Sequence, residues 1–124
     1  MRLALIALLV PDYDEALRFF VEGLGWTCTA DIDQGRKRWV TVRPPGGGAD
    51  VLLARAAGEQ ARGIGDQFAG RVGLFLHTDD FTRDSARIRT AGGTFAEDPR
   101  MEGYGTVAVW TDPCGNRWDL IEPA

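Results

Sequence analysis

Two side chains of this sequence, His77 and Asp119, have the chemistry to move a proton. His77 is the only histidine, and because its imidazole titrates near neutral pH, a carboxylate holding the ring would make it a proton-transfer group. A strand-end histidine bonded to a neighbouring carbonyl is the simpler alternative. Alternation along residues 117–121 turns Asp119 inward, away from Trp118 and Leu120. Asp119 is therefore interpreted as a cleft carboxylate or as an acceptor for backbone amides.

A carboxylate in an apolar cleft is costly without a cation or a hydrogen-bond donor beside it. The predicted partners of Asp119 are Arg117, Arg71 and His77. Phe75 and His77 are two residues apart on one predicted strand, so their side chains point to the same face, and both are expected to face the cleft.

Aromatic side chains could form the walls of a binding cleft. Trp39 and Trp110 offer large surfaces for stacking on a planar ligand, although packing in the core or at a dimer interface is the alternative for both. Tyr104 lies in a glycine-flanked loop at 101–105, where it either leans over the cleft or sits exposed in an ordinary hairpin.

These residues are carried by a pattern that occurs twice. Sliding the sequence by about 68 positions places Asp12-Tyr13 on Asp80-Phe81, Gly25 on Gly93, and Leu52-Leu53 on Leu120-Ile121. Each copy predicts a strand, a helix begun by an aspartate cap and ended by glycine, and three more strands. The predicted strands are 3–10, 26–32, 38–43, 50–54, 72–78, 94–96, 106–111 and 117–121, and the helices begin at Asp12 and Asp80. The chain is thus one α+β domain, 1–124, with a first module at about 1–56, a connector at about 57–70 and a second module at about 71–124.

Composition narrows the classes of function. A net charge of -4 argues against nucleic acid as a partner, because such binding needs a basic face. The apolar run 3–10 is eight residues long, too short to cross a membrane, and Pro11-Asp12 follows it without a small-residue cleavage site. Two cysteines 86 positions apart indicate reduced thiols. We therefore expect a cytoplasmic protein.

The two βαβββ modules, the run Val10-Pro11-Asp12-Tyr13-Asp14-Glu15-Ala16-Leu17-Arg18-Phe19-Phe20, and the terminal Asp112-Pro113-Cys114-Gly115-Asn116-Arg117-Trp118-Asp119 resemble the vicinal oxygen chelate superfamily. That superfamily includes glyoxalase I, extradiol dioxygenases and bleomycin resistance proteins. The resemblance implies the glyoxalase/bleomycin resistance/dioxygenase fold, in which two half-barrels surround a cleft. It also implies a homodimer.

Metal-dependent members of the superfamily carry His, Gln or Glu ligands at four strand positions. By resemblance these positions fall at Leu5, at Val51 or Leu53, at Gly73 or Arg71, and at Asp119. Since one carboxylate cannot hold a divalent metal, we expect no metal and no cofactor.

The predicted function is metal-independent binding of a small organic molecule in an apolar cleft. The predicted ligand-binding residues are Leu5, Ala7, Trp39, Leu53, Arg71, Phe75, His77, Tyr104 and Asp119. One alternative is a glyoxalase- or dioxygenase-type lyase, isomerase or oxygenase, which would use a metal or proton transfer by His77 and Asp119. A dimeric interaction module is the second alternative.

Overall fold

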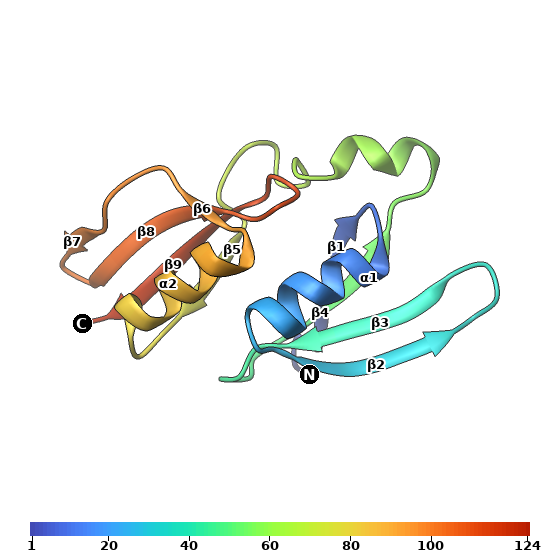
Figure 1. Ribbon diagram of the computed structural model, residues 1–124, viewed down its shortest axis with the longest axis horizontal. Coiled ribbons are helices and arrows are strands. Elements are labelled where there is room, and N and C mark those ends of the chain that lie inside the picture. The colour runs from blue at the N-terminus through green and yellow to red at the C-terminus, as the bar shows by residue number, and fades with distance from the viewer. The chain divides into compact units, whose positions relative to one another are not determined.

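Strand pairing in the computed structural model, which describes residues 1–124, is confined within two units, Met1–Ile64 and Gly65–Ala124 (Figure 1). The division falls inside the predicted connector. None of the helices has the length and apolar character needed to cross a membrane.

Unit 1 contains a four-stranded sheet and one long helical segment. Its elements are β1 (Leu5–Val10), α1 (Tyr13–Leu17) continuing into the π-helical η1 (Arg18–Gly23), β2 (Thr27–Asp33), β3 (Arg38–Arg43), β4 (Asp50–Arg55) and the 3₁₀ helix η2 (Gly58–Gly63). The strand order is β1-β4-β3-β2. β1 runs parallel to β4, and the other pairs are antiparallel.

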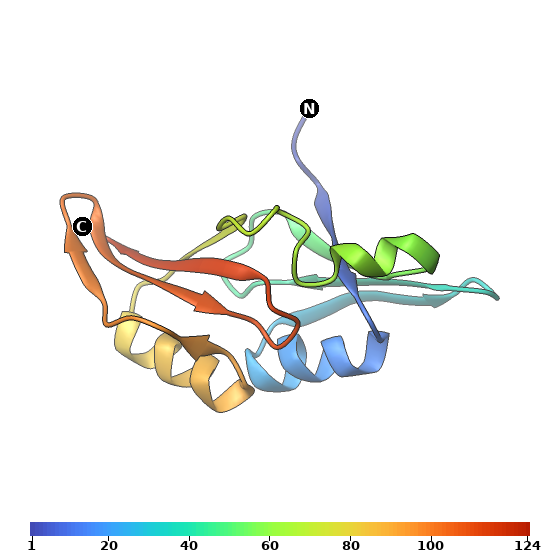
Figure 2. The ribbon, with the colours of Figure 1, turned by 90° about the horizontal axis from the view of Figure 1, so that it is seen from above.

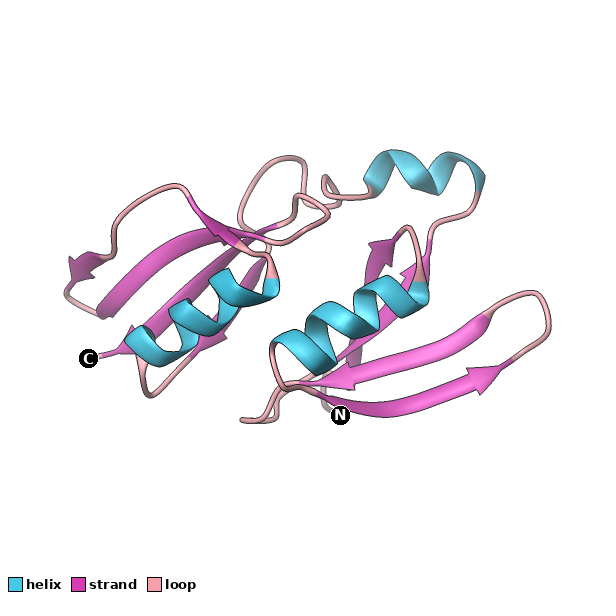
Figure 3. Ribbon diagram, viewed as in Figure 1, coloured by secondary structure: helices cyan, strands magenta, loops and turns pink.

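Unit 2 repeats this plan with one difference. Its elements are β5 (Leu74–His77), α2 (Phe81–Ala91), β6 (Thr94–Phe95), β7 (Arg100–Glu102), β8 (Gly105–Thr111) and β9 (Arg117–Pro123) (Figure 3). The order is β5-β9-β8-β6, and β7 also pairs with β8. The predicted βαβββ repeat is confirmed, but the counterpart of the continuous β2 is broken into β6 and β7.

Both helices begin at the predicted aspartates. Asp12 accepts a hydrogen bond from Glu15 N at 2.9 Å, and Asp80 accepts one from Arg83 N at 2.9 Å. Each cap satisfies an amide that the first helical turn leaves without a partner. Helix α2 ends at Ala91 and is capped by Gly92, whose φ of +116° favours glycine.

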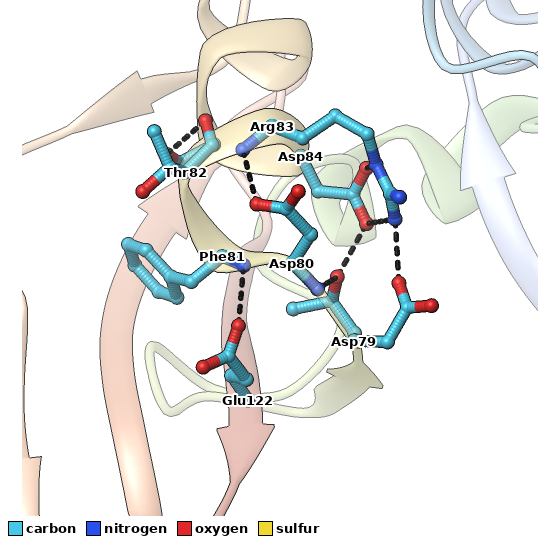
Figure 4. A network of polar contacts seen from close by, with 9 residues as sticks. Asp79, Asp80, Phe81, Thr82, Arg83, Asp84 and Glu122 are labelled. Atoms are coloured by element: carbon cyan, nitrogen blue, oxygen red, sulfur yellow. Dashed lines mark hydrogen bonds and ion pairs between the residues drawn. The ribbon is translucent and has the colours of Figure 1, made fainter.

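Further polar contacts tie the start of α2 to the ends of β5 and β9 (Figure 4). Glu122 on β9 accepts a hydrogen bond from Phe81 N at 2.9 Å. The Arg83 guanidinium lies 2.7 Å from Asp79 and 3.0 Å from Asp84. The Thr78 hydroxyl, just after β5, bonds to Asp84. These contacts hold the start of α2 against β9 and against the residues that directly follow His77.

Each helix covers one face of its own sheet (Figure 2). The core of each unit lies between its helix and its sheet. The fully buried side chains on these faces include Leu8, Val40, Val42, Leu53, Trp110, Trp118 and Leu120. We call the opposite side of each sheet its open face.

Residues 3–10 are all apolar, which predicts a strand with both of its faces covered. This prediction is wrong for the first part of the strand. Leu3 is 67% exposed and Ala7 is exposed, because α1 packs on one face only. On the other face, η2 reaches only the end of β1, where Gly63 packs against the Leu9 side chain.

Candidate functional site

The open face of unit 2 carries the two residues with proton-transfer chemistry. Phe75 lies opposite Asp119 in the parallel β5–β9 pair, and His77 lies opposite Ile121. Trp118 and Leu120 face α2 and are 1% and 2% exposed. The structure therefore brings Phe75, His77 and Asp119 to one face, as strand alternation predicts.

Asp119 is half-buried on this face, and its Oδ1 atom is buried without a hydrogen-bond partner. Burial raises the pKa of the Asp119 carboxyl above its ordinary value, while the charge of Arg100 acts in the opposite direction. Glu97 raises this pKa further, and Arg117 lowers it. Of the three predicted partners, Arg117 contributes through its charge, but none of them bonds to Oδ1.

Glu97 lies in the break between β6 and β7, and Arg100 is the first residue of β7; the sequence reasoning missed both. Val109, opposite Asp119 on β8, donates its N–H to Glu97 Oε1 at 3.1 Å. Arg100 lies 3.4 Å from Glu97 and 3.1 Å from Glu102. Pro99 could have indicated this break from the sequence, because proline has no N–H to donate to the hydrogen bonds of a sheet and so interrupts a strand.

A further aromatic residue, Phe68, lies against the backbone of Gly73. A Cβ atom built at residue 73 would come within 2.1 Å of the Phe68 ring. Only glycine therefore lets the ring approach β5 this closely. Gly73 has the same parity as Phe75, so Phe68 extends the aromatic surface of the open face.

The open face of unit 1 is mainly apolar, with the polar side chains of Thr41, Arg43 and Asp50 toward one end. Its apolar side chains come from β1, β4, β3 and β2, and they are Leu5, Ala7, Leu9, Leu52, Ala54, Trp39, Ala30 and Ile32. Trp39 is half-buried and Ile32 is 54% exposed. The polar end of this face holds an Arg43–Asp50 ion pair at 2.7 Å.

The prediction that Leu53 lines the cleft is corrected by the structure. Leu53 lies opposite Leu8 and is 0% exposed, in the core beneath α1. Leu52 has the opposite parity and lies on the open face, opposite Ala7 and Thr41.

A difference in loop length accounts for this error. Six residues, 44–49, join β3 to β4, whereas five residues, 112–116, join β8 to β9. Thr41 on β3 pairs with Leu52 on β4, and Val109 on β8 pairs with Asp119 on β9. Thr41 and its counterpart Val109 are 68 positions apart, whereas Leu52 and its counterpart Asp119 are only 67 apart. A shift of one residue moves every side chain of a strand to the other face. Leu52 is thus the true counterpart of Asp119.

The other predicted residues take different places. Arg71 is exposed in the turn before β5 and donates its Nε–H to the Val72 carbonyl at 3.2 Å. Tyr104 is 57% exposed in the turn between β7 and β8, five residues and about 17 Å along the strand from Val109. Trp110 is 0% exposed and stacks on Trp118 with ring centroids 5.0 Å apart, so it belongs to the core.

Comparison with known proteins identifies the fold and the family. A sequence profile of the Glyoxalase/Bleomycin resistance protein/Dioxygenase superfamily matches residues 2–120. The chain belongs to this superfamily.

Three relatives illustrate the similarity. An uncharacterised protein of Shewanella frigidimarina (strain NCIMB 400) is 50% identical over 121 residues, which are 94% of this chain and 90% of that protein. The crystal structure of TnmS3, an antibiotic binding protein from Streptomyces sp. CB03234, is 29% identical with a TM-score of 0.79, covering 100% of this chain and 97% of that one. A superfamily member from Sphaerobacter thermophilus DSM 20745 is 28% identical with a TM-score of 0.76, covering 98% and 97%.

The residues present do not fit the metal centre that some members of the glyoxalase/bleomycin resistance/dioxygenase superfamily use. At the central cross-strand positions of the open faces lie Ala7 with Leu52, and Phe75 with Asp119. Only Asp119 offers a ligand atom, and the Phe68 ring fills the space beside Gly73. No group of three or more His, Cys, Asp or Glu side chains is placed to hold an ion. A divalent centre needs at least three such ligands.

The raised pKa of Asp119 predicts a pH-dependent effect on stability. At a pH well below 3.8, the ordinary pKa of this carboxyl, Asp119 is protonated in both the folded and the unfolded chain. As the pH rises, Asp119 ionises first in the unfolded chain, because its pKa is higher in the folded one. The folded state therefore loses stability between pH 3.8 and the raised pKa of Asp119. We expect Asp119→Asn to match the wild-type Tm at about pH 3 and to exceed it by about 1–3 °C at pH 7. Thermal denaturation at both pH values checks this, and an equal difference at both would contradict it.

Proposed function

We propose that this superfamily member binds a small organic molecule on its apolar open faces without using a metal. The main supporting observation is the environment of Asp119. Its carboxyl is half-buried, its Oδ1 atom has no hydrogen-bond partner, and it lies opposite Phe75, which is 56% exposed. An apolar surface with one polar group lacking a partner is typical of sites that orient a ligand. The antibiotic-binding activity stated for TnmS3 supports the same class of function.

In this proposal each open face is a binding surface by itself, and that of unit 1 supplies apolar contact area from Leu5, Ala7, Leu52 and Trp39. Leu52 replaces Leu53 in the proposed set, because Leu53 lies in the core. In unit 2, Phe75 and His77 flank Asp119 on the same face. Burying one large apolar side chain is worth about 1.5–3 kcal/mol, so a few such contacts suffice for binding.

We also propose a homodimer in the reducing environment of the cytoplasm. Large apolar side chains remain exposed, including Ile32, Phe75 and Met101, and surfaces of this kind usually meet a partner or a ligand. Cys28 and Cys114 are not joined in a disulfide bond. Sedimentation velocity over a range of concentrations tests the assembly, and a monomer at every concentration would contradict it.

Binding is tested by a thermal-shift screen of small aromatic and dicarbonyl compounds, followed by calorimetric titration of the hits. For the best hit we expect Asp119→Asn to change Kd by about 10- to 100-fold with the fold retained, the range for one hydrogen bond to a charged group. Asp66→Asn, on an exposed turn of the same unit, is the matched control. Unchanged affinity in Asp119→Asn for every hit would remove Asp119 from the site.

The same samples distinguish binding from catalysis. Protein purified without chelators is analysed for metals, and each hit is incubated and followed for turnover. Stoichiometric metal with turnover of a hit would replace the binding proposal by the lyase, isomerase or oxygenase alternative. If the screen yields no hit, the interaction-module alternative is favoured instead.

A further inference from the structure

The charges around Asp119 bear on which ligands the proposed site accepts. Four charged groups make up the electrostatic setting of this part of unit 2, namely Asp119, Glu97, Arg100 and Arg117. Two are acidic and two are basic, so their formal sum is zero. The group therefore has no excess of positive charge that would favour an anionic ligand.

Both arginines already have partners. Arg100 is shared between the carboxylates of Glu97 and Glu102, at 3.4 Å and 3.1 Å. Arg117 donates its Nη1–H to the Gly70 carbonyl at 3.0 Å. An anionic ligand would compete with these contacts and would be repelled by the carboxylate of Asp119 itself.

The Asp119 carboxyl, by contrast, needs a donor. A buried acceptor without a partner is unfavourable, and a ligand donor that reaches the carboxyl recovers part of the lost free energy. Because neighbouring strands lie about 4.8 Å apart, a ring stacked on Phe75 carries its substituent close to this carboxyl. The apolar neighbours Val109, Ile121 and Phe68 reduce competition from water.

Resting on the proposed function, we infer that the site selects planar apolar ligands with a cationic or neutral hydrogen-bond donor and rejects carboxylate-bearing analogues. Asp119 is the residue that determines this specificity. Phe75 supplies stacking area and does not discriminate between charges.

Three naphthalene probes of matched shape test this inference, namely 2-naphthylmethylamine, 2-naphthalenemethanol and 2-naphthoate. Each is titrated into the full chain at pH 7 by calorimetry. We expect the amine to bind at least about 10-fold more tightly than the carboxylate, with the alcohol between them, as one charge-assisted hydrogen bond provides. In Asp119→Asn the ratio of amine to carboxylate affinity should fall toward one.

Two further variants separate charge selection from stacking. Phe75→Ala should weaken all three probes by a similar factor and leave their order unchanged. Asp66→Asn removes one negative charge from an exposed turn and should leave the ratio unchanged. A ratio that falls as much in Asp66→Asn as in Asp119→Asn would assign the effect to net charge and overturn the role of Asp119.

The outcomes also distinguish failure of this inference from failure of the proposed function. Naphthoate binding as tightly as the amine would overturn the charge selection while leaving ligand binding in place. An unchanged ratio in Asp119→Asn would do the same. If none of the three probes binds, the inference is wrong, and the proposed function fails with it only if the wider screen also yields no hit.

Discussion

Replacing Asp112 by alanine is expected to destabilise the protein by about 3–5 kcal/mol, which corresponds to a Tm lower by about 10–20 °C. Asp112 is buried between β8 and β9, and its carboxylate accepts five hydrogen bonds. They come from the amides of residues 114–116, the Asn116 side chain and Trp118 Nε1, at 2.9–3.0 Å. Alanine would leave the buried Trp118 and Asn116 donors without this acceptor.

Urea denaturation of wild type and variant measures this effect. Asp112→Asn keeps one acceptor oxygen and should cost less, about 1–2 kcal/mol. Asp66→Ala, on an exposed turn, should stay within about 0.5 kcal/mol of wild type. A loss in Asp112→Ala as small as that of the Asp66 variant would show that the turn contributes little to stability.

Two adjacent leucines of β4 should respond in opposite ways. Leu53→Ala is expected to cost about 2–5 kcal/mol of stability, because the side chain is 0% exposed and its removal leaves a cavity. Leu52→Ala removes a half-buried side chain from the open face and should cost about 1 kcal/mol or less. Its main effect should be on ligand affinity, which we expect to fall about 5- to 10-fold for the best hit of the screen.

Denaturation and calorimetry on both variants measure the two effects separately. If Leu52→Ala were the more destabilising change, the assignment of the two faces of β4 would be wrong. Equal loss of ligand affinity in both variants, measured well below the Tm of each, would show that the open face of unit 1 does not contact the ligand.

Much of the architecture could be predicted because the signals were local. Asp12 and Asp80 cap the two helices as their positions in the repeat require. Gly92 stops α2. The face of Asp119 followed from strand alternation with its neighbour Trp118, which is buried.

The errors arose where the repeat is not exact. Leu53 was assigned to the wrong face, because the loop 44–49 is one residue longer than its counterpart 112–116 and changes the parity of the following strand. The break at Pro99 places Glu97 and Arg100 near Asp119, and a repeat based on the continuous β2 could not predict it. Phe68 lies in a segment that reads as a connector and has no strand pattern, so only the structure reveals its packing on Gly73.

The confinement of strand pairing within units has a consequence for biosynthesis. The widest pairing in each sheet joins residues about 45 positions apart, as Leu5 with Asp50 and Phe75 with Asp119 do. All strands of the first sheet are present once residue 55 has left the ribosome. Because domains generally fold from the N-terminus during synthesis, we expect the first sheet to form before β9 has been translated.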